Sequence, residues 1–142
     1  MATLTVTIKE ELILNGAEHG SENVISITGV TESLHRIIDI PTLSETTLAS
    51  FGSATGGSTF IDETAQYVRV THLDTTNYAT LRVLGTSEEY FVRLDPEGSF
   101  MLFNSKMDAN ATGSQTASFA DVENIKAQAN SAAIQLEVFV AV

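Results

Sequence analysis

Apolar and polar residues alternate in short segments along the whole chain, and Gly, Asn, Asp or Pro separates these segments. The clearest segments are residues 4–8, 24–30, 34–40, 67–73, 78–84, 90–94, 125–129 and 134–142. A period of two turns one face of a β-strand toward a core. The pattern predicts an all-β fold, namely a β-sandwich or jelly-roll-like arrangement of roughly nine to ten short antiparallel strands.

Three segments between the predicted strands carry local structural signals. Asn15-Gly16 is a typical two-residue hairpin turn. Asp95-Pro96-Glu97-Gly98 predicts a type I turn in which Gly98 takes a left-handed conformation. Residues 44–50 fit either a strand or a short helical turn, and the sequence leaves both open.

Loop lengths then predict which strands pair as hairpins. A loop over residues 74–77 predicts a hairpin in which Val70 lies opposite Leu81, so that the apolar faces of both strands agree. A tight turn at Asn130-Ser131 predicts a second hairpin, with Ile125 opposite Leu136. The composition of residues 119–129 also fits a helix; we favour the strand because this register closes without a slip.

The first of these registers sets Arg69 directly opposite Arg82 on the polar face. Like charges opposite each other across a ladder are unfavourable, so a negative group is expected between them. That group is either a carboxylate of the same chain or an acidic patch on a neighbouring copy or another partner. Tyr67 and Tyr78 lie on the same face. We therefore predict Arg69, Arg82, Tyr67 and Tyr78 as partner-binding residues.

The composition limits the class of protein. The chain has 142 residues, no cysteine, and 18 acidic against 7 basic residues, which gives a net charge of −11. This length predicts a single domain over residues 1–142. The negative charge disfavours nucleic acid and anionic membranes as partners. Residues 1–5 lack the basic and apolar regions of a signal peptide, so no secretory leader is expected.

Catalytic and metal-binding chemistry has little support in the sequence. His19, His35 and His72 show no metal-ligand spacing, and the paired carboxylates fall in predicted turns, where solvated surface is the simpler interpretation. A calcium site at Asp74 or Asp95 would need a denser arrangement of carboxylates. We therefore predict no enzyme activity, no metal and no cofactor. The apolar strand 134–142 is expected either inside a sheet or at an edge open to another chain.

Four stretches together carry a resemblance to a known class of proteins. They are the opening MATLTVTIKE, then YVRVTHLDTTNYATLRV, YFVRLDPEGSFMLF and IQLEVFVAV. They resemble small β-rich virion structural proteins of tailed bacteriophages, of a type found in marine phages. The resemblance implies a capsid decoration or cement protein, or alternatively a tail or head–tail component. It implies copies of the chain itself and other virion proteins as partners, synthesis in the host cytoplasm, and no catalytic residues. A receptor- or carbohydrate-binding fibre module is a further alternative.

Overall fold

A computed structural model describes residues 2–52, 59–61, 65–107 and 119–142. Within these residues the chain forms strands and the turns that join them, and no helix. The contacts divide the chain into two compact units, Met1–Glu32 and Ser33–Val142, whereas its length predicted one domain. The all-β class is confirmed, and each unit has its own architecture.

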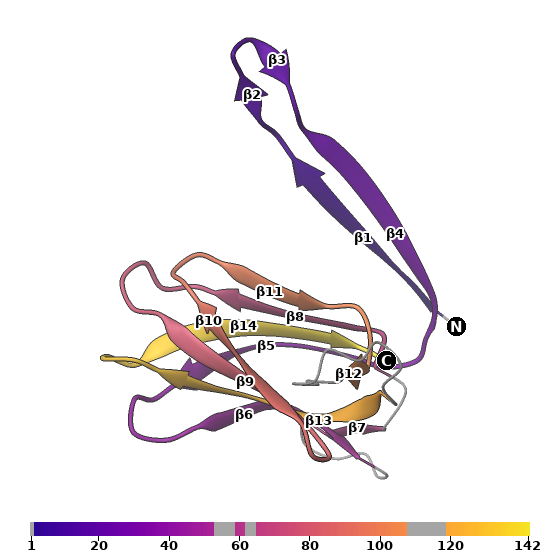
Figure 1. Ribbon diagram of the computed structural model, residues 1–142. Coiled ribbons are helices and arrows are strands. Elements are labelled where there is room, and N and C mark those ends of the chain that lie inside the picture. The colour runs from indigo at the N-terminus through magenta and orange to yellow at the C-terminus, as the bar shows by residue number, and fades with distance from the viewer. Residues whose placement is uncertain (1, 53–58, 62–64, 108–118) are drawn as a thin grey trace. The chain divides into compact units, whose positions relative to one another are not determined.

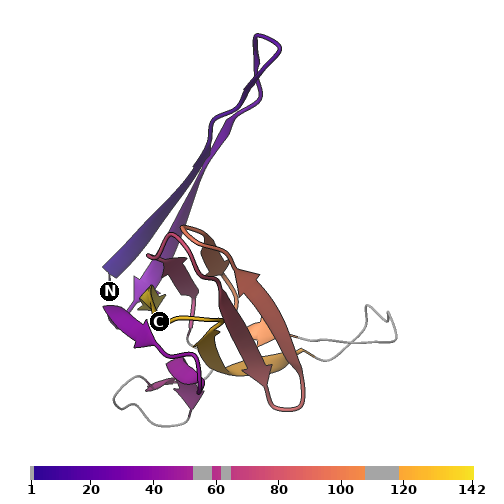
Figure 2. The ribbon, with the colours of Figure 1, turned by 90° about the vertical axis from the view of Figure 1, so that its left-hand side faces the viewer.

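The first unit is a long antiparallel β-hairpin, which we call the arm. Its main strands are β1 (Ala2–Glu10) and β4 (Ser21–Val30), and its tip is formed by β2 (Ile13–Leu14) and β3 (Ala17–Glu18). Figure 2 shows β1 and β4 side by side along their length.

The tip of the arm confirms the predicted hairpin turn. Asn15 and Gly16 link β2 to β3, and both have a positive φ, of 51° and 79°. Positive φ at both central residues is what a two-residue hairpin turn of type I′ requires, and this turn matches the right-handed twist of the strands. Gly and Asn adopt this conformation at the lowest steric cost, so the tip is encoded locally.

The second unit consists of two sheets (Figure 1). The four-stranded sheet has the order β11 (Ser99–Leu102), β8 (Tyr67–His72), β14 (Ile134–Ala141) and β5 (Ser33–Ile40). The six-stranded sheet has the order β10 (Glu89–Leu94), β9 (Ala79–Gly85), β13 (Ala120–Ala129), β6 (Thr46–Gly52) and β7 (Thr59–Ile61), with β12 (Lys106–Met107) paired to β13. The pairing of β6 with β7 is parallel, and the other pairings are antiparallel.

One hydrophobic core joins the two sheets of the second unit. Val70 and Val138 from the four-stranded sheet and Leu81 and Ile125 from the six-stranded sheet are fully buried members of the same cluster. Inward-facing and outward-facing residues alternate along the strands, as in a β-sandwich. The predicted buried positions Val68, Val70, Leu81 and Val83 are therefore correct, and β14 lies inside its sheet, between β8 and β5.

Both predicted hairpins of this unit are wrong. β8 pairs with β11 and β14, whereas β9 pairs with β10 and β13, so residues 67–73 and 78–84 belong to different sheets. The predicted hairpin of β13 with β14 is wrong for the same reason, because β13 belongs to the six-stranded sheet and β14 to the four-stranded sheet. A connection that crosses from one sheet to the other keeps the same apolar face toward the core, so alternation alone does not distinguish it from a hairpin.

The two crossing connections support each other. The backbone N–H of Tyr78 donates to the side-chain oxygen of Asn130 (3.1 Å), and the N–H of Asn130 donates to the carbonyl oxygen of Tyr78 (3.2 Å). The hydroxyl of Ser131 donates to the side chain of Asn77 (2.7 Å). The sequence predicted separate turns at residues 74–77 and 130–131. Hydrogen bonds join the two connections at one end of the sandwich.

Two further local expectations differ from the structure. Residues 46–52 form strand β6, so the short helical turn considered for residues 44–50 is not formed. In the turn from β10 to β11 the left-handed residue is Glu97 (φ 60°), not Gly98. Gly98 is required for another reason: a Cβ there would lie 2.9 Å from the carbonyl oxygen of Asp95, which accepts the Gly98 N–H at 3.0 Å.

Candidate functional site

The outer face of the four-stranded sheet carries an unusual row of side chains. Met101, Arg69, Phe139 and His35 are successive cross-strand neighbours on β11, β8, β14 and β5. The face of an antiparallel sheet that points away from the core is normally polar. This row therefore marks the outer face as a candidate interaction surface.

Further apolar side chains extend the row into what we call the apolar patch, formed by Ile37, Met101, Phe103 and Phe139. Ile37 is 58% exposed, and Met101 and Phe103 are each 38% exposed. The buried ring of Tyr67 links the patch together, because its centroid lies 5.0 Å from that of Phe103 and 5.9 Å from that of Phe139. Exposed apolar side chains gathered on one face are typical of interaction surfaces.

Arg69 lies within this surface and is held by groups of its own sheet. Its guanidinium pairs with the carboxylate of Glu137 and donates to the hydroxyl of Thr71 (2.8 Å). The same carboxylate lies 3.5 Å from Nε2 of His35. Burial raises the pKa of Tyr67, and the neighbouring positive charge of Arg69 partly opposes that rise. Arg69 thus already has a carboxylate partner within the chain.

The outer face of the six-stranded sheet carries Arg82. Its guanidinium forms ion pairs with Glu89 (2.6 Å) and Glu45 (3.1 Å). The hydrogen bond that Arg82 donates to Glu89 is the main cause that raises the pKa of Arg82. The residue directly opposite Arg82 on β13 is Lys126, so two cations meet across this ladder.

A shallow depression of about 290 Å³ lies beside Arg82 on this face. Tyr78 and Phe91 line it, together with polar side chains such as Gln128. Phe91 is 59% exposed, and the guanidinium of Arg93 lies 4.2 Å from the ring centroid of Tyr78. Aromatic rings beside amide groups form the kind of surface that can bind a polar ligand such as a sugar.

The four residues predicted to bind a partner are therefore not brought together. Tyr67 and Arg69 lie on β8 of the four-stranded sheet. Tyr78 directly precedes β9 of the six-stranded sheet, and Arg82 lies within β9. The predicted pairing of Arg69 with Arg82 is wrong. Each arginine has a carboxylate of the same chain beside it, which is the first of the two options that the sequence left open. Their role toward a partner stays a prediction.

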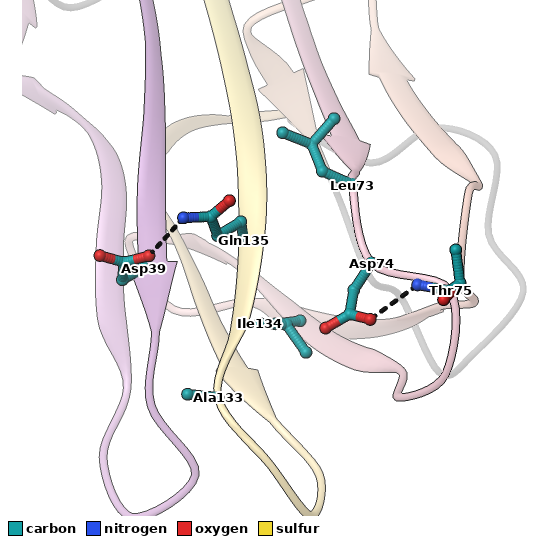
Figure 3. Close-up of a pocket in the computed structure, with 7 residues that line it drawn as sticks. All are labelled: Asp39, Leu73, Asp74, Thr75, Ala133, Ile134 and Gln135. Carbon is teal, nitrogen blue, oxygen red and sulfur yellow. Dashed lines mark hydrogen bonds between the residues drawn. The ribbon is translucent and has the colours of Figure 1, made fainter.

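A second depression, of about 420 Å³, lies at one end of the four-stranded sheet (Figure 3). Its two carboxylates are both engaged: Asp39 accepts a hydrogen bond from Gln135 (2.9 Å), and Asp74 accepts the backbone N–H of Thr75 (2.7 Å). Asp74 thus stabilises its own turn. Among the described residues, no group of three or more His, Cys, Asp or Glu side chains could hold a metal ion.

His72 comes directly before Leu73 and Asp74, which line this depression. It is the one buried polar residue among those described. It is 1% exposed, and its Nδ1 accepts the backbone N–H of Asp74 at 3.1 Å. Its Nε2 has no hydrogen-bond partner. This arrangement fits the interpretation of His72 as a strand residue that shapes the following turn.

The arm presents a surface that sequence reasoning did not identify. Its cross-strand pairs Leu4–Ile27 and Val6–Ile25 place apolar side chains on one face, and Ile8 continues that face toward the tip. The opposite face carries mainly Thr and Ser, together with Val24 and charged side chains near the tip. At the tip, Leu12, Ile13 and Leu14 are 53%, 79% and 53% exposed. The alternation was visible in the sequence, but the absence of a third strand from this unit was not.

Comparisons with known proteins do not assign the chain to a family. No protein-family model, curated protein or solved structure matches it. The described part of the chain contains no helix long and apolar enough to cross a membrane.

Proposed function

We propose that this chain is a non-enzymatic virion structural protein that acts through protein–protein contacts, as a capsid decoration or cement protein. The observation that carries the proposal is the arm. It is a two-stranded hairpin with one apolar face, formed by Leu4, Val6, Ile8, Ile25 and Ile27, and with an exposed apolar tip.

Such a hairpin gains little stability on its own. A two-stranded sheet in water is marginally stable, because its single layer leaves both faces open to solvent. Covering the apolar face removes that surface from water and contributes roughly 25 cal/mol per Å². An element of this kind is suited to joining subunits of an assembled shell.

The charge of the chain supports a position away from nucleic acid. With a net charge of −11, the protein is repelled by the phosphate backbone and by anionic lipid surfaces. Neighbouring virion proteins, including copies of the chain itself, remain as the partners that we propose. The resemblance of four sequence stretches to virion proteins of tailed phages supports the same class.

Two alternatives have support of their own. The arm serves equally well in a tail or head–tail component, where subunits also join through extended elements. The depression lined by Tyr78 and Phe91 favours a receptor- or carbohydrate-binding fibre module. Binding of a glycan that is lost on Phe91→Ala, with the fold retained, would support that second alternative.

The position of the protein in a particle tests the proposal. Mass spectrometry of gradient-purified particles should detect the chain at a fixed ratio to the major capsid protein. Immunogold electron microscopy should place it on the shell. Label on the tail would select the tail alternative, and absence of the chain from purified particles of an expressing phage would contradict a virion role.

A further inference from the structure

We infer that the apolar face of the arm packs on the apolar patch of a second copy of this chain, and that two copies exchange arms reciprocally. The inference rests on the proposed function, since it takes assembly as the purpose of both surfaces. It goes further by naming the partner and the place where the arm binds.

The arm supplies one half of the interface. Leu4, Val6, Ile8, Ile25 and Ile27 form a continuous apolar face, and each remains partly exposed. The cross-strand pairs Leu4–Ile27 and Val6–Ile25 bring apolar side chains into direct contact. Within its own unit the arm has no second layer to cover this face.

The apolar patch supplies the other half. It lies on the outer face of the four-stranded sheet, whose inner face already packs on the core. An arm that covers the patch would therefore add a third layer to the two sheets of the sandwich. Ile37 lies on β5, Phe139 on β14, and Met101 and Phe103 on and just after β11; Arg69 of β8 lies between Met101 and Phe139, with its charge paired by Glu137. Two flat sheets pack face to face at about 10 Å, with their side chains interdigitated.

The area of the arm favours exchange between two copies. A strand of about nine residues spans about 30 Å, and two strands are about 10 Å wide, so one face of the arm covers roughly 300 Å². Packing it on an equal area buries roughly 600 Å², which is in the range of weak contacts. Two arms exchanged reciprocally bury roughly 1,200 Å², which reaches the range of specific interfaces.

Cross-linking between differently tagged copies tests the inference. The chain has no cysteine, so each introduced thiol is unique. A Val6→Cys copy and an Ile37→Cys copy, mixed and treated with a short bis-maleimide, should give a product that carries both tags. Two control mixtures should give at least about tenfold less product: Thr5→Cys with Ile37→Cys, and Val6→Cys with Phe91→Cys. Thr5 lies on the opposite face of the arm, and Phe91 on the outer face of the other sheet.

Sedimentation equilibrium provides an independent measure. The wild-type protein should form a dimer, and Ile37→Glu should raise the dimer Kd at least about tenfold, because a charge would be buried in the interface. Phe91→Glu is the matched control and should leave the Kd unchanged. Both side chains are exposed on a folded sheet, so the circular dichroism spectra of both variants should match that of the wild type.

Three results would overturn the inference. They are a wild-type protein that stays monomeric at all concentrations, a cross-link that forms only when both thiols are in one chain, and arms that cross-link in particles to a different virion protein. None of these contradicts a virion role. Conversely, a dimer that is absent from purified particles would contradict the proposed function and leave the arm exchange intact.

Discussion

Lys126 of β13 lies directly opposite Arg82 of β9, on the outer face of the six-stranded sheet. Two cations in this position repel each other. The carboxylates of Glu89 and Glu45 lie 2.6 Å and 3.1 Å from the guanidinium of Arg82 and offset that repulsion. The four side chains therefore form one coupled surface network.

This network predicts a coupling between two substitutions. Glu89→Gln should lower the stability of the protein, since it removes a carboxylate from beside Arg82 and leaves less negative charge to offset the repulsion from Lys126. Adding Lys126→Gln should recover part of the loss, because one of the cations is then gone. A double-mutant cycle from urea unfolding measures the coupling. It should shrink at high salt, where exposed charges are screened. Additive effects of the two changes would show that Lys126 does not belong to the network.

The pairing of Val70 with Val138 predicts a core effect. Both side chains are fully buried, and they lie opposite each other on β8 and β14. Val70→Ala should lower the free energy of unfolding by about 1–3 kcal/mol, through lost burial and a partial cavity. Val24→Ala on the arm, where the side chain is 57% exposed, is the matched control and should change it by less than about 0.5 kcal/mol. Equal effects at the two positions would contradict the described core.

The turn between β10 and β11 predicts opposite effects at adjacent residues. Gly98→Ala should lower the free energy of unfolding by about 1–3 kcal/mol, because the new Cβ would displace the carbonyl of Asp95 and weaken its hydrogen bond. Glu97→Gly should raise it by up to about 1 kcal/mol, since Glu97 has a φ of 60° and glycine relieves that strain. Chemical denaturation of both variants measures the two signs. A Gly98→Ala protein as stable as the wild type would contradict the described turn.

Two tyrosines predict a loss of stability at alkaline pH. Burial raises the pKa of Tyr67 and of Tyr90 above the ordinary value of 10.0. In the unfolded chain these hydroxyls lose their protons first, so their contribution is complete below about pH 10 and falls as pH rises through the folded-state values. The double variant Tyr67→Phe/Tyr90→Phe should therefore lose less stability above pH 10 than the wild type does. Unfolding midpoints measured across that range test the prediction, and parallel pH profiles would contradict it.

Where the alternation is clear, the sequence alone determined the strands and the direction in which their side chains point. Alternation at Val68 and Val70, and at Leu81 and Val83, placed these residues in the core correctly, because side-chain direction in a strand depends only on its period of two. The Asn15-Gly16 turn was also predictable, since two adjacent residues with positive φ define it.

Only the tertiary structure decided which strands are neighbours. β8 and β14 pair across more than half of the second unit, and a strand with one apolar face satisfies the core equally well beside any partner of the same sandwich. That choice separated Arg69 from Arg82, placed Arg82 opposite Lys126, and gathered Ile37, Met101 and Phe139 on one outer face. It also left the arm without a third strand. Neighbourhood on a sheet depends on the packing of distant segments, so no local pattern in the chain encodes it.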